Sequence, residues 1–388
     1  MADETSTIPK GWKITTLGEV LDIRNGKSRP QDGNKYPVYG GNGVLGYADE
    51  YNINEEIIIV GRVGAYCGCI YFEKNKFWLS DNALGVLANE NSNIKFLYYL
   101  LKRLNLNKQA IGGAQPLLTQ GVINQIEVLT PEKVEEQRAI AAVLSSLDDK
   151  IELLREQNKT LEATAQAIFK EWFVNYHFPG VGKMVDSEIG KIPEGWRVGK
   201  LGDEIQTILG GTPSTEKKEY WENGNIPWIN SGKVNDFRIY EPTSYITEKA
   251  LDESAAKLMP KGTVVIAITG ATLGQVSMLE IESTGNQSVI GIIPNEKFSS
   301  AYLFYWMLKN VSTIINTATG GAQQHINKND VNGFDFIVPA DDILKKHYEA
   351  VNPMIEKISS NCFQIQTLST LRDTLLPKLM KGELRIKN

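Results

Sequence analysis

Residues 8–20 read IPKGWKITTLGEV, and residues 192–205 read IPEGWRVGKLGDEI. The two stretches share an Ile-Pro, a Gly-Trp and a Leu-Gly dipeptide at positions that lie 184 residues apart. Farther along the chain, GAYCG at 64–68 matches GATLG at 270–274, and the tetrapeptide GGAQ occurs twice with a spacing of 208 residues. Self-similarity over so long a spacing is typical of a duplicated structural unit. The sequence therefore predicts one fold that occurs twice.

The second copy is longer than the first and lacks one of its motifs. GNGVLG at 41–46 fits the GxGxxG pattern of dinucleotide-binding sites, but Pro37 and Gly40 interrupt any strand before it and no amphipathic helix follows it. The second copy contains no counterpart of this motif. We therefore expect residues 41–46 to form a loop particular to the first copy, and a nucleotide-binding enzyme is the weaker alternative.

A heptad pattern follows Pro131. Apolar residues alternate there at spacings of four and three without interruption, which is typical of a coiled coil. The ten positions are Ile140, Leu144, Leu147, Ile151, Leu154, Asn158, Leu161, Ala165, Ile168 and Trp172. Asn158 is the only strongly polar residue among them, and a polar residue at such a position fixes the register of paired helices. We expect Asn158 to have this role.

A second heptad pattern follows Pro339. Its positions are Leu344, Tyr348, Val351, Ile355, Ile358, Cys362 and Ile365, and then, after a shift of one residue, Leu368, Leu371 and Leu375. Pro353 is expected to kink this helix locally, and Pro377 is expected to stop it or bend its end. About 35 helical residues span about 50 Å, so we expect an antiparallel pair with one globular domain at each end. Two core helices of ordinary domains are the alternative.

The globular segments mix strands and helices. In both copies, an apolar run, a glycine-rich turn and a second apolar run predict two strands, and an amphipathic segment downstream predicts a helix. The predicted fold class is α+β, with two pseudo-repeated globular domains separated by a long antiparallel two-helix coiled coil. The expected domain boundaries are 1–131 and 176–339 for the globular domains, and 132–175 and 340–388 for the helices.

The composition is that of an ordinary globular protein, with 42% hydrophobic residues, 22% charged residues and a net charge of −5. This charge argues against a protein that holds nucleic acid unaided, because phosphate binding usually requires a basic surplus. No segment predicts a membrane span or a signal peptide, so a cytoplasmic protein without membrane contact is expected. Cys67, Cys69 and Cys362 are expected to pack in the interior, and the three histidines are too scattered to predict a metal site.

Several of these segments together resemble the specificity (S) subunit of type I restriction-modification systems. The likeness covers essentially the whole chain, and its most specific part is EEQRAIAAVLSSLDDKIELL at 135–154. GGTPSTEKKEYWENGNIPWINSGKV at 210–234 is similar to the start of one class of target recognition domain, and YPVYGGNGVLGY at 36–47 is similar to another. The second long helix departs from the pattern, because DDILKKHYEAVNPMIEKISSN at 341–361 lacks the EEQR start.

The resemblance implies a DNA-binding subunit without catalytic residues. Each target recognition domain would read one half of a split site in double-stranded DNA, and the helices would set the spacing of the halves. The helices would also dock two methyltransferase (M) subunits that methylate adenine at N6 with S-adenosylmethionine, and restriction (R) subunits would use ATP and Mg²⁺ to cut DNA. No cofactor or metal is expected on this chain, which has neither an Asn-Pro-Pro-aromatic methyltransferase motif nor a GxxxxGK loop. A coiled-coil scaffold that binds only proteins is the second alternative.

Candidate DNA contacts are polar and basic residues of the glycine-rich segments, because such side chains bind base edges and phosphates. In the first domain they are Arg24, Lys27, Arg29, Asn42 and Arg62. In the second domain they are Thr212, Ser214, Lys217, Lys218, Asn230, Ser231, Lys233, Gln323, His325 and Lys328. The tryptophans Trp12 and Trp196 are expected in the core, and packing is also the favoured role of Trp221 and Trp228.

Overall fold

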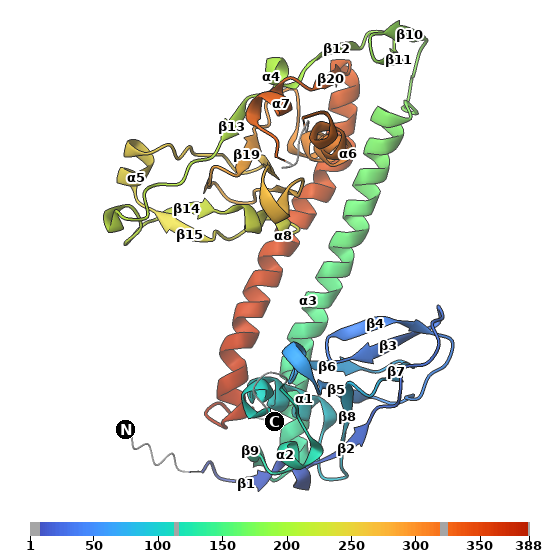
Figure 1. Cartoon of the computed structure of the whole chain (residues 1–388), viewed down its shortest axis with the longest axis vertical. Coiled ribbons are helices and arrows are strands. Elements are labelled where there is room, and N and C mark those ends of the chain that lie inside the picture. Colours follow the sequence, from blue (N-terminus) through green and yellow to red (C-terminus); the bar gives the residue numbers. More distant parts are fainter. Residues whose placement is uncertain (1–7, 112–115, 319–324, 387–388) are drawn as a thin grey trace. The chain divides into compact units, whose positions relative to one another are not determined.

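The computed structural model describes residues 8–111, 116–318 and 325–386 (Figure 1). The chain forms two compact units. Unit 1 consists of Met1–Glu152 and Thr367–Asn388, and unit 2 consists of Leu153–Gln366. Each unit contains one globular domain together with part of each of two long helices, which are described first.

The long helices are α3 (Val134–Phe169) and α8 (Asp341–Met380). Both begin with acidic residues in the first turn, which favours the positive end of the helix dipole. A π-helical turn, Lys170–Val174, extends α3. Helix α8 continues through Pro353 and past Pro377, so neither proline ends it where it stands.

The described part of unit 1 contains three small sheets. The strands are β1 (Trp12–Thr16), β2 (Leu21–Asn25), β3 (Tyr36–Gly40), β4 (Gly43–Ala48), β5 (Ile57–Gly61), β6 (Ile70–Glu73), β7 (Trp78–Leu79), β8 (Ala83–Ala88) and β9 (Glu127–Pro131). They pair in the orders β1-β9, β2-β8-β5-β6 and β4-β3-β7. Two further helices, α1 (Ile94–Arg103) and α2 (Gln120–Asn124), complete the domain.

In unit 2, a small hairpin of β10 (Met184–Ser187) and β11 (Gly190–Pro193) follows α3. Its other strands are β12 (Arg197–Lys200), β13 (Thr207–Leu209), β14 (Ile226–Ile229), β15 (Ser244–Ile246), β16 (Val264–Ala267), β17 (Val276–Met278), β18 (Thr284–Gly285), β19 (Val289–Ile292) and β20 (Asp335–Val338). They pair in the orders β12-β20, β13-β19-β16-β17 and β15-β14-β18. The helices are α4 (Leu201–Glu204), α5 (Glu248–Glu253), α6 (Ser300–Ala318) and α7 (Lys328–Asn332).

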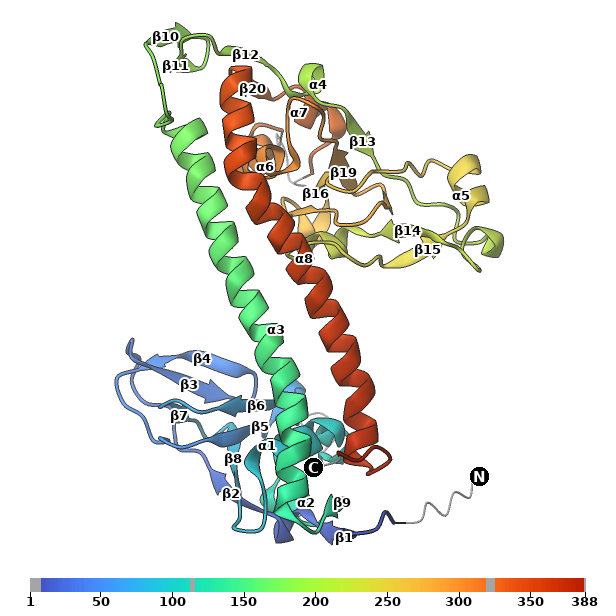
Figure 2. The same cartoon turned by 180° about the vertical axis from the view of Figure 1, so that it is seen from behind.

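The two globular domains have the same topology. Each of the three sheet orders in unit 1 recurs in unit 2 when the strands are taken in chain order, and β3 pairs with β7 in parallel just as β14 pairs with β18. Helix α1 packs on β5 and β6 (Figure 2), and α6 packs on the equivalent strands β16 and β17 of unit 2. The predicted α+β repeat is confirmed.

The glycine motif at 41–46 is not the loop that we expected. β3 and β4 form an antiparallel hairpin, and Gly41 and Asn42 are the turn between them. Gly43 and Gly46 have φ angles of +78° and +151°, which favour glycine, so the glycines serve the hairpin. The expectation failed because Pro37, Gly40, Gly43 and Gly46 lie within the two strands and hide the alternation of side chains from which strands are predicted.

The core of unit 2 shows where the second heptad pattern was misjudged. Tyr348, which we placed on the buried face of α8, is 48% exposed, whereas His347 is fully buried. The aromatic rings of Phe169, Phe173 and Tyr302 surround the imidazole, with centroid distances of 6.2, 4.9 and 6.3 Å. Tyrosine was favoured because its ring is apolar, but a neutral imidazole also packs among aromatic rings.

Burial lowers the pKa of His347 to about 4. Among the described residues, neither ring nitrogen has a hydrogen-bond partner. An unfolded histidine has a pKa near 6.5, so the unfolded chain takes up a proton before the folded chain does. The stability associated with neutral His347 is therefore complete above pH 6.5 and falls as the pH drops from 6.5 towards 4.

We expect His347→Leu to remove this pH dependence and to stabilise unit 2 at neutral pH by about 1 kcal/mol, because the unpaired nitrogens are lost. Thermal unfolding of the wild-type and variant chains between pH 7.5 and 4.5 measures the effect. The gap between their melting temperatures should widen on acidification. A constant gap, or a variant that is less stable at every pH, contradicts the interpretation.

Candidate nucleic-acid interface

In unit 1, several glycine-rich segments meet around residues 80–83. The backbone N–H of Lys27 donates to Leu79 O, that of Gly26 donates to Ala83 O, and that of Arg62 donates to Asn82 O. The turn of the β3-β4 hairpin lies beside them, because a Cβ on Gly61 would stand 2.7 Å from Gly41 O. The chain therefore brings three predicted contacts, Lys27, Asn42 and Arg62, onto neighbouring loops.

The glycines of these segments allow close approach of backbones. A Cβ on Gly26 would lie 1.8 Å from Ser80 O, which no side chain tolerates. The absence of a Cβ at Gly26 and Gly61 therefore allows this close approach. It leaves polar side chains of separate loops next to one another at one end of the strands.

Unit 2 repeats this convergence with different residues. The segments after β13, β14 and β16 meet around residues 285–288, through Gly211 N–H to Gly285 O, Asn286 N–H to Ile229 O, and Ile268 N–H to Ser288 O. Thr212 and Asn230, both predicted contacts, lie on these segments. The loop ends of the two domains are therefore equivalent in backbone and different in side chains.

Sequence reasoning missed three polar residues of unit 2 at this position. The hydroxyl of Thr212 donates to Gln287 Oε1, and the hydroxyl of Thr269 donates to Ser288 Oγ at 2.7 Å. Gln287, Ser288 and Thr269 were not among the candidates because they flank apolar strands and belong to no motif. The repeat carries a signal for Thr269 alone, because residues 268–269 follow β16 just as the predicted contact Arg62 follows β5.

The predicted cations differ in how firmly acidic neighbours hold them. Arg24 pairs with Glu55 at 2.6 Å and Arg29 pairs with Asp32 at 2.7 Å, and all four side chains are well exposed. Exposed pairs of this kind contribute about 0–1 kcal/mol, so a phosphate can replace the carboxylate at little cost.

Lys233 is held more firmly. It is only 17% exposed and lies 2.9 Å from Asp236 and 3.1 Å from Glu241. Burial disfavours its charged form, but the hydrogen bonds to these two carboxylates raise its pKa overall. Its contacts stabilise the Ser231–Asn235 turn, where Asn230 accepts the Lys233 N–H. We therefore assign Lys233 a structural role in addition to its predicted role as a DNA contact.

The remaining candidates occupy varied positions. Asn42, Lys27, Ser214, Lys218 and His325 are exposed, while Ser231 and Lys328 are half-buried. Lys217 donates to the Tyr220 hydroxyl at 2.8 Å. Arg62 is half-buried, and its Nε has no partner among the described residues. Gln323 lies outside the described residues.

The tryptophans behave as predicted. Trp12 and Trp196 are buried, and Trp221 packs edge-on against Trp228 with a centroid distance of 5.2 Å. Cys67 and Cys362 are buried, and Cys69 is half-buried.

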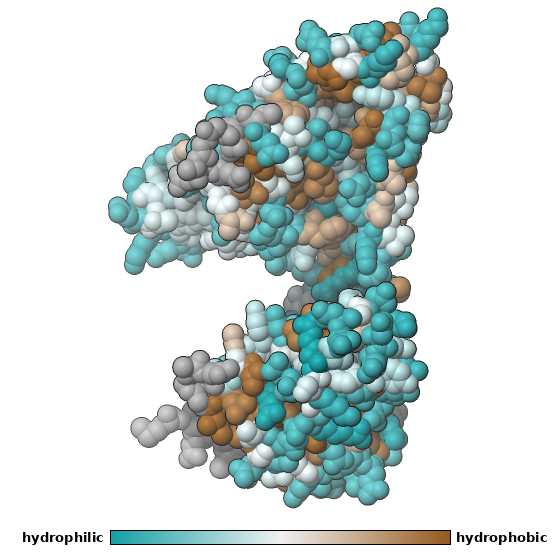
Figure 3. All heavy atoms as spheres, turned by 45° about the vertical axis from the view of Figure 1, so that its right-hand side comes forward, coloured by the Kyte–Doolittle hydropathy of each residue, from teal (hydrophilic) through white to brown (hydrophobic). Residues whose placement is uncertain are grey.

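Within the described residues, no group of three or more His, Cys, Asp or Glu side chains could hold a metal ion, and no helix is long and apolar enough to cross a membrane. Hydrophilic residues cover much of the visible surface (Figure 3).

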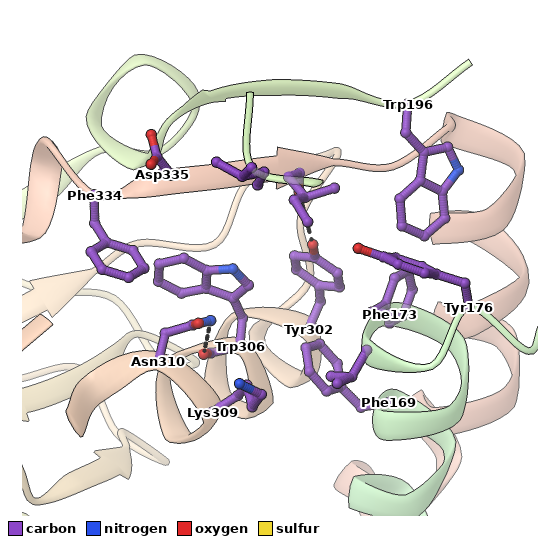
Figure 4. Close-up of a pocket in the computed structure, with 13 residues that line it drawn as sticks. Phe169, Phe173, Tyr176, Trp196, Tyr302, Trp306, Lys309, Asn310, Phe334 and Asp335 are labelled. Carbon is purple, nitrogen blue, oxygen red and sulfur yellow. Dashed lines mark hydrogen bonds between the residues drawn. The ribbon is translucent and has the colours of Figure 1, made fainter. Parts of the chain in front are cut away.

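Unit 2 also contains a pocket of about 330 Å³, which is an alternative candidate site (Figure 4). Aromatic side chains that include Phe173, Trp196 and Trp306 line it. Its hydrogen bonds run to the backbone, from the Tyr302 hydroxyl to Ile337 O and from Asn310 Nδ2 to Trp306 O. The aromatic residues of the pocket belong to the core of unit 2 or pack against it, so we interpret the pocket as imperfect packing between the helices and the β12-β20 sheet.

Asn158 lies on α3 and is 4% exposed. Its Oδ1 accepts a hydrogen bond of 2.8 Å from Asn361 Nδ2 of α8, and its Nδ2 lies 3.7 Å from the Cys362 sulfur. Asn361, which is fully buried and also donates to Gln157 Oε1, was not predicted, because the heptad pattern placed only Cys362 on that turn. The buried polar contact is therefore a pair of asparagines.

Comparison with known proteins identifies the duplicated domain. The family model described as type I restriction modification DNA specificity domain matches residues 9–163 and 193–368. The chain belongs to this family. It is accordingly a specificity subunit of a type I restriction-modification system, as the resemblance implied.

Individual relatives span most of this specificity subunit. The MjaIX specificity subunit of the type I restriction enzyme from Methanocaldococcus jannaschii is 27% identical, with 98% of this chain and 95% of the relative covered. The HindI specificity subunit from Haemophilus influenzae is also 27% identical, over 77% of this chain and 80% of the relative. A crystal structure of the S subunit from M. genitalium shares the fold, with a TM-score of 0.69, 18% identity, and 97% and 98% coverage.

The asparagine pair leads to a stability prediction. Asn158→Leu removes one of the two α3 acceptors of Asn361 Nδ2, and Gln157 Oε1 remains as the other. One buried N–H of Asn361 then lacks an acceptor, so we expect the single substitution to lower the free energy of unfolding by about 1–3 kcal/mol. Asn158→Leu/Asn361→Leu removes both polar groups and should recover that loss. Urea unfolding of the three chains tests this, and a single variant as stable as the double variant would show that the pair contributes nothing.

Proposed function

We propose that this specificity subunit reads a bipartite site in double-stranded DNA, with one half-site for each recognition domain. The observation that carries the proposal is the repeated convergence of loops around 80–83 and 285–288, with equivalent backbones and different polar side chains. Equivalent backbones present side chains to DNA in the same way, and different side chains select different bases. The predicted contacts act here together with Gln287, Ser288 and Thr269.

We propose further that α3 and α8 form one long antiparallel coiled coil that sets the half-site spacing. Two contacts support this pairing. Asp148 of α3 binds Arg372 of α8 in unit 1, and Asn158 contacts Cys362 in unit 2. From Asp148 to Asn158 is ten residues forward along α3, and from Arg372 to Cys362 is ten residues backward along α8. A continuous antiparallel register requires this relation. Asn158 then acts as the register residue.

The duplication also suggests the partners. Two copies of one fold offer equivalent surfaces, so a single subunit can bind two identical methyltransferase subunits while its DNA-reading loops differ. We propose that these subunits carry S-adenosylmethionine and that restriction subunits carry ATP and Mg²⁺, with no cofactor or catalysis on this chain. The net charge of −5 fits a subunit whose partners supply part of the basic surface, and the assembly would work in the cytoplasm.

Co-expression with the cognate methyltransferase subunits tests the proposal. We expect N6-methyladenine at one bipartite motif when all partners are present, and none from the purified chain with S-adenosylmethionine alone. Methylome sequencing makes both measurements. Methyl transfer by the chain alone, or methylation that is independent of this chain, would refute the assignment. A chain that binds the methyltransferase subunits but directs no methylation would favour the protein-only scaffold.

Independent reading by the two domains predicts modular exchange. Replacement of residues 13–111 with the corresponding segment of another specificity subunit should change one half of the methylated motif and leave the other half and the spacing unchanged. The same exchange within the second domain is the matched control and should change the other half. If one exchange alters both halves, the domains do not read DNA separately.

A further inference from the structure

A buried charge network joins the second recognition domain to both long helices. Its members are Arg238 and Glu280 of the domain, Glu162 of α3 and Ser359 of α8, and we call them the unit 2 clamp. The Arg238 side chain is fully buried, and its Nη2 donates to Glu162 Oε2 at 2.6 Å. Ser359 Oγ donates to Glu280 Oε2 at 2.6 Å, and the Glu280 side chain is 3% exposed.

The domain holds its two members of the clamp together. The chain segments around Ile239 and Leu279 pair as a parallel bridge, which places Arg238 Nε 3.8 Å from Glu280 Oε1. The guanidinium also stacks on the rings of Phe237 and Phe304, 4.6 and 4.5 Å from their centroids. The orientation of the Arg238 guanidinium is therefore restricted. Glu162 can accept its hydrogen bond only from one position relative to the domain.

Unit 1 contains a different network with the same connections. The hydroxyl of Tyr99, from α1 of the first domain, donates to Asp148 Oδ2 of α3 at 2.8 Å. Arg372 Nη1 of α8 donates to Asp148 Oδ1 at 2.7 Å. One carboxylate thus joins the recognition domain to both helices, and we call Tyr99, Asp148 and Arg372 the unit 1 clamp.

Charged side chains at these positions carry a cost in folding free energy. A buried ion pair is desolvated, and apolar residues of similar volume often pack at least as well. The hydrogen bonds of charged groups, however, are short and directional, whereas apolar contacts tolerate sliding. Both domains are bound to the helices by such hydrogen bonds, although the residues differ. This indicates that the clamps fix the position of each domain on its own segments of α3 and α8.

We propose that the two clamps are positioning networks that fix each recognition domain on its own segment of α3 and α8, and that they thereby hold the half-site spacing to one value. This inference rests on the proposed bipartite reading. Displacement of a domain by two helical residues moves it by about 3 Å, close to one base-pair step. A small displacement of one domain along the helices should therefore change the spacing between the two methylated half-sites.

The test replaces the unit 2 clamp with apolar side chains, Glu162→Met/Arg238→Met/Glu280→Met/Ser359→Ala, in the complex with methyltransferase subunits. We expect a folded chain whose half-site sequences are unchanged. Methylation at spacers one base pair shorter or longer should rise about tenfold relative to wild type, because no charge-assisted bond opposes displacement. Thermal unfolding and methylome sequencing are the readouts. Tyr99→Phe/Asp148→Met/Arg372→Met is the corresponding variant in unit 1.

Two further variants make the outcome decisive. Arg238→Lys keeps the charge but loses the planar fork, so it should relax the spacing to a smaller extent and decides the question if the apolar variant does not fold. Lys200→Met/Asp335→Leu removes an exposed ion pair of 2.6 Å in the same unit and should leave the spacing sharp.

A single sharp spacer in the clamp variants overturns the inference, and so does a uniform loss of methylation at an unchanged spacer, which is what a purely stabilising role predicts. Failure of the proposed function would look different, because the wild-type complex itself would then methylate no bipartite motif.

Discussion

The apolar faces of α3 and α8 must be buried, and a helix of this length cannot bury its own face. In unit 1, Ile140 and Leu144 of α3 share a core with Leu379 and Met380 of α8. In unit 2, Ala165 and Phe169 of α3 share a core with residues of α8 that include Val351. Each globular domain packs into the same cores, so helix pairing and domain docking are one folding event within each unit.

Polar groups within these cores give the packing its specificity. Hydrophobic burial stabilises many arrangements of two helices almost equally, since it is not directional. The Asn158–Asn361 contact and the two clamps form their hydrogen bonds in one arrangement, and a displaced helix or domain would break them and leave further buried polar atoms unpaired. Apolar residues of these interfaces therefore stabilise the fold, and polar residues of the same interfaces fix the relative positions of the packed elements within each unit.

The recognition loops combine a fixed backbone with variable side chains. Glycines such as Gly26 and Gly61 allow the backbones of separate segments to approach closely, and the hydrogen bonds around 80–83 recur around 285–288. Exposed side chains of these loops, such as Lys27 and Asn42, lie outside the core, so packing does not fix their identity. Under the proposed function, such loops could change their base preference without a change of fold.

The sequence by itself determined the duplication, the fold class and the two long helices, because the Ile-Pro/Gly-Trp repeat and the heptad spacing are local patterns. It also placed Trp12 and Trp196 in the core. Only the tertiary structure decided that residues 41–46 form a hairpin, that His347 and not Tyr348 is buried, and that Asn361 pairs with Asn158. It also brought Arg238, Glu162, Glu280 and Ser359 together. These contacts join residues from about 40 to more than 200 positions apart, and no periodic pattern specifies which polar side chains meet across two packed elements.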